Sequence, residues 1–85
     1  MKIYSIFDKI ASVYNTPFFC PGHGVAMRNF NDLVMDPSTV VSRHPSDFEL
    51  FCLGDFFEDT GNIEVNAQPL FLIRGSEFSG VQKDD

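Results

Sequence analysis

The sequence has 85 residues, of which 44% are hydrophobic and ten are phenylalanines, so it is too apolar and too weakly charged for a disordered chain. Twelve acidic and six basic residues give a formal net charge of −6, which opposes non-specific attraction to phosphate backbones. No apolar run approaches the ~20 residues of a membrane span, and charged residues interrupt the first ten positions, where a signal peptide would be apolar. We therefore expect one soluble domain that stays in the compartment where it is made.

The first half of the chain predicts a hairpin followed by a helix. Residues 2–8 alternate β-branched and aromatic side chains, and a second apolar run, SVYNTPFFC, follows after a few residues. We expect the two runs to pair, with Pro17 at an edge or bulge because proline cannot donate to a strand ladder. Over residues 25–36 the apolar spacing becomes helical, and Pro37 ends that helix.

The second half of the chain predicts another hairpin. Residues 37–48 contain two prolines and several capping residues, so we expect a loop with one helical turn at residues 45–48. The turn signal EDTGN, in which Gly61 supplies a positive φ, joins strand arms at residues 48–57 and 62–65. The last apolar run, PLFLIRG, is a candidate fifth strand.

These elements predict an α+β fold in which one helix packs on a small antiparallel sheet of two hairpins, in the order ββαββ with the optional fifth strand at the end. We assign residues 1–75 to a single compact domain. Residues 76–85 are expected to form a mobile C-terminal tail, because that segment carries nothing that it needs to bury.

The strand predicted at residues 48–57 is apolar on both of its faces. Alternation gives a first face, which we assign to the core, of Phe48, Leu50, Cys52, Gly54 and Phe56. The second face carries Phe51, Leu53 and Phe57, which one short helix cannot also cover. Either the sheet curls into a small barrel or the same face of a second chain covers these residues. We favour a homodimer through these three residues, because two-fold self-contact is the commonest way for a small chain to complete its core.

Three candidate sites near the cysteines have suitable residue types but lack the rest of the pattern that each function requires. A zinc set of Cys20, His23, His44 and Cys52 would need paired ligands on short knuckles, and Cys52 falls on the predicted core face. The segment PGHGV has the glycines of an anion site but no phosphate-loop pattern. A nucleophile pair of Cys20 and His23 lacks an orienting third group. We interpret the two cysteines as unbridged packing residues of an intracellular protein.

The acidic hairpin turn is also a weak candidate for a binding site. Glu58, Asp59 and Glu64 gather there, but they do not follow the alternating oxygen pattern of a calcium loop. We therefore predict that the chain is not an enzyme and that it needs no metal, no cofactor and no small-molecule substrate.

A nucleic-acid role for so acidic a chain would require a local basic patch. Lys2 and Tyr4 share a strand face, and Lys9 and Tyr14 lie near the first hairpin, so this hairpin is a candidate stacking platform with a cationic edge. With two arginines added, the candidate DNA-binding residues are Lys2, Tyr4, Lys9, Tyr14, Arg28 and Arg43. The alternative interpretation is ordinary surface lysines and half-buried tyrosines.

Three segments, MKIYSIFDK, PFFCPGHGVAMRNFNDLVMDP and HPSDFELFCLGDFFEDTGNI, resemble the small nonstructural protein of gokushoviruses, single-stranded DNA phages of the Microviridae. Members of that family are described as nonstructural or DNA-binding. They are compared with protein C of the larger coliphages, which is associated with the switch from double-stranded replication to single-stranded genomes. The resemblance brings no catalytic motif with it.

The resemblance implies a binding protein of the host bacterial cytoplasm that acts in phage genome replication or in the switch to packaging. Its partner would be single-stranded DNA or a replication protein. The alternative hypothesis is an adaptor or inhibitor that binds one host protein and never contacts DNA.

Overall fold

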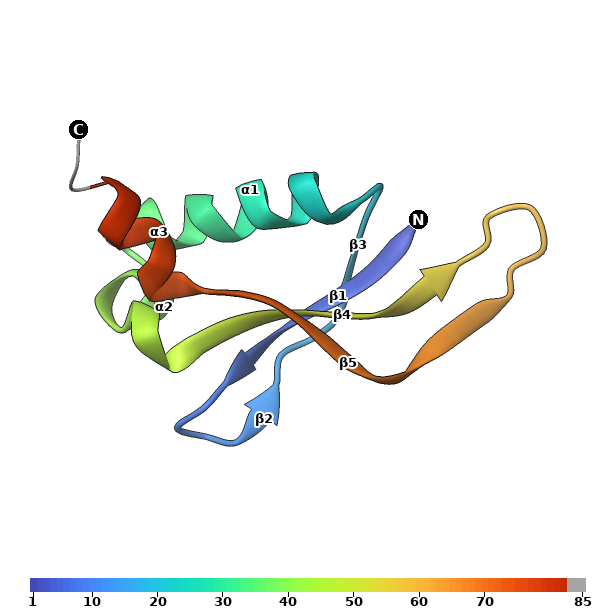
Figure 1. Ribbon diagram of the computed structural model, residues 1–85, viewed down its shortest axis with the longest axis horizontal. Coiled ribbons are helices and arrows are strands. Elements are labelled where there is room, and N and C mark those ends of the chain that lie inside the picture. The colour runs from blue at the N-terminus through green and yellow to red at the C-terminus, as the bar shows by residue number, and fades with distance from the viewer. Residues whose placement is uncertain (83–85) are drawn as a thin grey trace.

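The computed structural model describes residues 1–82 of the chain, with side chains for residues 1–78. Its elements in chain order are β1 (Lys2–Asp8), β2 (Val13–Tyr14), β3 (Phe18–Cys20), α1 (His23–Met35), α2 (Val40–Arg43), the 3-10 turn η1 (Pro45–Asp47), β4 (Phe48–Phe56), β5 (Ile63–Arg74) and α3 (Gly75–Gln82). The strands form one antiparallel sheet, and the main helix α1 lies along one of its faces (Figure 1). The predicted α+β fold is confirmed, and the sheet is open, so the barrel alternative is wrong.

The sheet has the order β2–β1–β4–β5, and β3 also pairs with β1. Phe7 of β1 lies opposite Tyr14 of β2, and Ile3 lies opposite Phe19 of β3. Since the other edge of β1 pairs with β4 along its whole length, β2 and β3 together form one interrupted edge strand. Pro17 lies in the interruption, as the first predicted hairpin requires.

The second hairpin is longer than predicted. β5 is one strand from Ile63 to Arg74, so the candidate fifth strand is its second half and not a separate element. In the turn between β4 and β5, Gly61 has a φ of 77°, as the turn signal predicted. The pairing of β4 with β5 shifts register twice, which keeps so long a strand in contact with a shorter one.

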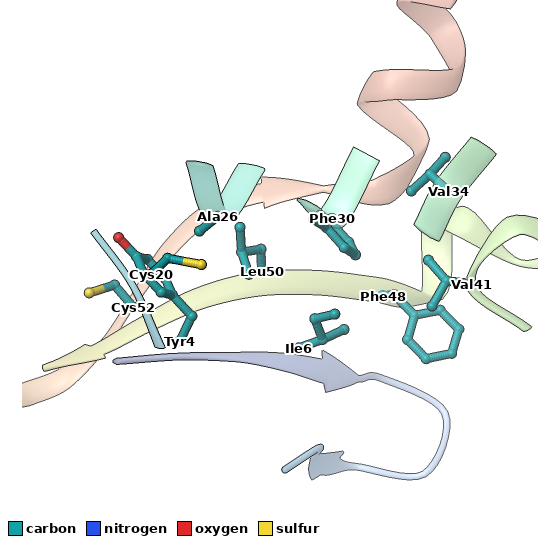
Figure 2. Close-up of a cluster of buried hydrophobic side chains, with 10 residues drawn as sticks. All are labelled: Tyr4, Ile6, Cys20, Ala26, Phe30, Val34, Val41, Phe48, Leu50 and Cys52. Atoms are coloured by element: carbon teal, nitrogen blue, oxygen red, sulfur yellow. The ribbon is translucent and has the colours of Figure 1, made fainter. Parts of the chain in front are cut away.

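The core lies between α1 and the sheet (Figure 2). Its buried side chains are Tyr4, Ile6, Cys20, Ala26, Phe30, Val34, Val41, Phe48, Leu50 and Cys52. Helix α1 contributes Ala26, Phe30 and Val34, which recur at the four-residue spacing of one helix face. The sheet face that points away from α1 is called the open face below.

A β-bulge in β4 changes which of its side chains reach the core. The consecutive residues Ile3 and Tyr4 of β1 pair with Gly54 and Cys52, which leaves Leu53 as an extra residue in β4. One extra residue reverses the alternation of the strand beyond it. Phe56 therefore lies on the open face, and its predicted place in the core is wrong.

The loop before β4 contains more regular structure than predicted. The expected helical turn is η1, and the short helix α2 precedes it. The hydroxyl oxygen of Thr39 caps α2 by accepting a hydrogen bond from the backbone N–H of Ser42 at 3.1 Å.

The segment after Gly75 is a helix as far as the structure describes it. Within α3, the ring of Phe78 packs edge to face on the ring of Phe30, with 5.9 Å between centroids. The structure differs here from the predicted tail, because Phe78 supplies an apolar contact that anchors α3 to α1. Residues 83–85 of the predicted tail lie outside the described residues.

Among residues 1–82, no helix has the length and apolar character that a membrane crossing needs.

Candidate functional site

The open face carries a cluster of four aromatic rings, which we call the aromatic cluster: Phe7, Tyr14, Phe51 and Phe71. Each ring comes from a different strand of the sheet. Strand register places Phe7 directly opposite Tyr14, and Phe51 directly opposite Phe71. Such cross-strand aromatic pairs stabilise a sheet and keep the rings side by side.

Phe51 is the central ring of the aromatic cluster. Its centroid lies 6.1 Å from that of Phe7, 5.5 Å from that of Tyr14 and 5.7 Å from that of Phe71. All three contacts are edge to face, the arrangement that the ring quadrupole favours. Tyr14 is 44% exposed and Phe71 is 45% exposed, while the two other rings are half-buried. The cluster therefore presents two accessible rings in fixed orientations.

Three charged side chains lie at one end of the aromatic cluster. The Nε atom of Arg74 donates to Oε2 of Glu49 at 3.3 Å, and Nζ of Lys9 lies 3.9 Å from the same oxygen. Glu49 stands opposite Phe7 on one side and opposite Arg74 on the other. The side chain of Glu49 is only 14% exposed, whereas both cations are more than 40% exposed. Two cations against one carboxylate leave this end with a local charge of about +1.

The chemistry of the open face is thus stacking plus a weak positive field. Flat ligands such as nucleobases stack on exposed aromatic rings, and every base offers a π-face for this contact. An antiparallel sheet with aromatic side chains on one face and helices on the other is a known way to present such rings to single-stranded nucleic acid.

Comparison with known proteins places this chain in a phage family. Residues 1–78 match the family model described as Phage ORF5 protein. The chain belongs to the Phage ORF5 protein family. It is 34% identical over 83 residues to Protein ORF5 of Chlamydia phage 1, with 92% of this chain and 86% of that protein covered. No solved structure shows a significant match. The resemblance to a small gokushovirus protein is therefore confirmed.

In this ORF5-family chain, two of the six predicted DNA-binding residues reach the aromatic cluster. Tyr14 is one of its exposed rings, and Lys9 lies at its charged end. The other four lie elsewhere. Lys2 forms an ion pair with Asp55, 2.7 Å between Nζ and Oδ1, and this hydrogen bond raises the pKa of Lys2. Arg28 lies on α1 and Arg43 on α2, so the six residues do not form one basic patch.

Tyr4 does not belong to the candidate site. It is fully buried in the core, and its hydroxyl shares a 2.7 Å hydrogen bond with Nδ1 of His23 (Figure 2 shows the buried tyrosine). Burial raises the pKa of Tyr4 to about 12, because the charged phenolate would lose its hydration there. A side chain without exposed surface cannot stack on a base, which corrects the prediction for Tyr4.

The three predicted dimer residues have different surroundings. Phe51 is the centre of the aromatic cluster, Leu53 is half-buried at the bulge, and Phe57 is exposed where the turn after β4 begins. The homodimer stays a prediction, since a single chain does not test it.

The cysteine and histidine motifs do not come together as a site. Cys20 and Cys52 are both free and buried. Cys20 of β3 pairs with Lys2 along one edge of β1, and Cys52 of β4 pairs with Tyr4 along the other edge. Within residues 1–82 there is no group of three or more histidine, cysteine, aspartate or glutamate side chains that could hold a metal ion. The ring of His23 is engaged by the tyrosine of the core.

Four residues of this site were not predicted from the sequence: Phe7, Glu49, Phe71 and Arg74. The alternation of residues 2–8 already places Phe7 on a face opposite the tyrosine of the same strand. The place of Phe71 and Arg74 depends on two register shifts in β5, for which the sequence carries no local signal.

Proposed function

We propose that this phage protein acts in viral DNA replication, or in the switch to single-stranded genome synthesis and packaging, by binding single-stranded DNA on the aromatic cluster. It would act without catalysing a reaction, in the cytoplasm of the host bacterium. The observation that carries the proposal is the pair of exposed rings, Tyr14 and Phe71, held on the open face. Base stacking on one such ring contributes about 1–3 kcal/mol to binding.

The charge distribution defines what kind of DNA binding is expected. A net charge of −6 weakens the general attraction of phosphates, so stacking has to supply most of the affinity. Lys9 and Arg74 are the cations next to the rings, and Glu49 partly neutralises both. We therefore expect modest affinity with a shallow salt dependence of about two phosphate contacts at most.

Loss of the exposed rings should weaken DNA binding. We expect Tyr14→Ala and Phe71→Ala each to reduce the affinity for a labelled oligothymidine by about 5- to 150-fold, because each change removes one stacking contact. Fluorescence anisotropy at low salt measures this. Phe19→Ala is the matched control, since Phe19 is 48% exposed on the open face but lies outside the aromatic cluster.

Three results would contradict this prediction. If the control weakens binding as much as the ring variants, the aromatic cluster is not the DNA site. If the wild type binds no oligothymidine and its melting temperature falls on dilution, the open face holds a second copy of the chain. Absence of DNA binding with a dilution-independent melt would favour the host-protein adaptor.

Removal of the neutralising carboxylate should strengthen DNA binding. In Glu49→Gln, Lys9 and Arg74 lose their ion pairs and become available to phosphates. We expect tighter oligothymidine binding and a salt slope that is steeper by about 0.7 for each additional phosphate that the two cations neutralise. Asp55→Asn is the matched control, because it changes the net charge equally but frees only Lys2, away from the rings. Equal effects of the two variants would mean that net charge, and not this site, governs binding.

A further inference from the structure

A second apolar region, which we call the distal patch, lies on the open face near the β4–β5 turn. Its residues are Met1, Phe19, Phe56, Ile63 and Val65. Strand register places Phe56 opposite Ile63, and Gly54 opposite Val65, beyond the bulge that turns these positions to the open face. Val65 is 78% exposed, which is high for an apolar strand residue. This end of the hairpin extends past α1 (Figure 1), so no helix backs it.

The distal patch contains a preformed groove of about 400 Å³, lined by Met1, Phe19, Phe56 and Glu58. The rings of Phe19 and Phe56 pack edge to face at 5.6 Å and form its apolar floor. The backbone of Met1 is fixed beside them, because its ammonium group donates to the carbonyl of Phe56 and its carbonyl accepts from the N–H of the same residue. The groove therefore exists before any partner binds.

The hairpin around the distal patch is strongly acidic. Residues 55–65 contain Asp55, Glu58, Asp59 and Glu64 and no lysine or arginine. Lys2 pairs with the first carboxylate and the N-terminal ammonium lies 3.6 Å from the second. In the described part of the chain, Asp59 and Glu64 form no ion pair. Glu58 lines the groove, whereas Asp55 and Glu64 pair with each other in strand register, on the opposite face of the hairpin from Phe56 and Val65. The hairpin as a whole therefore carries a net negative charge, opposite in sign to the end near Arg74.

The backbone next to the distal patch offers a further means of contact. β5 is the last strand in the sheet order, so within the described chain one edge of its backbone has no strand partner. An extended peptide can add to such an edge, with main-chain hydrogen bonds for affinity and alternate side chains for specificity. Exposed apolar side chains at Ile63 and Val65 mark where those alternate side chains would pack.

We propose that the distal patch docks an extended, basic and apolar segment of a protein partner. The groove and Val65 would take its apolar side chains, and the carboxylates would attract its lysines or arginines. Single-stranded DNA is a poor occupant, because the net negative charge of this hairpin, with Glu58 at the groove itself, repels phosphates. A second copy is disfavoured, because two acidic hairpins would be brought together.

The probes for this docking site are two synthetic peptides, one of alternating lysine and valine and one of alternating glutamate and valine. We expect the lysine–valine peptide to bind the full chain and the glutamate–valine peptide not to bind, as measured by titration calorimetry. Val65→Ser should weaken binding about tenfold through loss of apolar contact. The high exposure of Val65 argues against unfolding as the cause of such a loss, and a thermal melt checks this.

Matched charge reversals separate docking from general attraction. Glu64→Lys should weaken binding of the lysine–valine peptide, whereas Asp32→Lys on α1, which changes the net charge equally, should not. Equal weakening by both variants, or an unchanged affinity in Val65→Ser, would overturn the proposal. Sedimentation showing a wild-type dimer that Val65→Ser dissociates would assign the patch to a second copy and would also overturn it.

The docking proposal and the DNA proposal fail independently. Tyr14→Ala and Phe71→Ala should retain peptide binding, and Val65→Ser should retain oligothymidine binding. A variant set in which both ligands are lost together would show that the distal patch is not a separate site.

Discussion

Replacement of Phe30 by alanine is expected to lower the free energy of unfolding by about 3–5 kcal/mol. Phe30 is fully buried, points from α1 toward β4 (Figure 2), and packs its ring on Phe78 of α3. Its removal leaves a cavity at the junction of the sheet and two helices. A domain of this length has a total stability of only about 4–13 kcal/mol, so a large part of it would be lost. Urea denaturation followed by far-ultraviolet circular dichroism measures the change.

Leu33→Ala on the same helix is the control for Phe30→Ala. Leu33 is 36% exposed, so its truncation should cost less than about 1 kcal/mol. Equal losses for the two variants would contradict the core face that the structure gives to α1. A normal stability for Phe30→Ala would show that α3 and the sheet do not close over this ring.

The elements with local signals could be predicted from the sequence. Helix α1 follows from apolar spacing that repeats every three to four residues, and Pro37 marks its end. The β4–β5 turn follows from the glycine that adopts a positive φ. In each case the signal and the structure lie within a few neighbouring residues.

The features that depend on distant contacts could not be predicted in this way. The bulge at Leu53 arises where β4 meets both β1 and β5, which are far from it in sequence. The contact between Phe78 and Phe30 joins residues 48 positions apart. Sequence periodicity shows which residues share a face but not which face a helix covers, and the prediction for Tyr4 is wrong for that reason.

The candidate site could be predicted only in part, because some of its residues have local signals and others depend on distant contacts. The sequence selects Tyr14 and Lys9 as DNA-binding candidates and, through strand alternation, Phe51 as a dimer-interface candidate. All three lie in or beside the aromatic cluster. Alternation alone also identifies the apolar second face of β4. Its division into a stacking region and a distal patch follows from the bulge, which moves Phe56 to that face.

The two proposed sites lie toward opposite ends of one sheet face. β4 runs from Glu49 beside the rings to Phe56 in the distal patch, a span of roughly 23 Å at the rise of an antiparallel strand. That separation leaves room for a DNA strand and a protein segment at the same time. The opposite local charges at the two ends also favour DNA at one end and a protein segment at the other. The acidic hairpin repels phosphates and attracts basic side chains.

Gly54→Ala should also be strongly destabilising, although it adds only one carbon atom. A Cβ at this position would overlap the backbone carbonyl oxygen of Glu64 and would lie 2.9 Å from the Cα of Val65. Neither of these atoms can rotate away, because both belong to the backbone of the paired strand. We expect the free energy of unfolding to fall by about 3 kcal/mol, because β5 has to move away from β4. The same movement should weaken peptide binding at the distal patch.

Gly24→Ala provides the opposite expectation in the same chain. Gly24 lies in α1, and a Cβ there meets no atom within 4 Å. Alanine should therefore stabilise the protein by about 0.5–1 kcal/mol, since glycine loses more backbone entropy in a helix. Urea denaturation of both variants tests the pair. If Gly54→Ala were as stable as the wild type, β4 and β5 would not approach so closely at this point, and the bulge would not require glycine beside it.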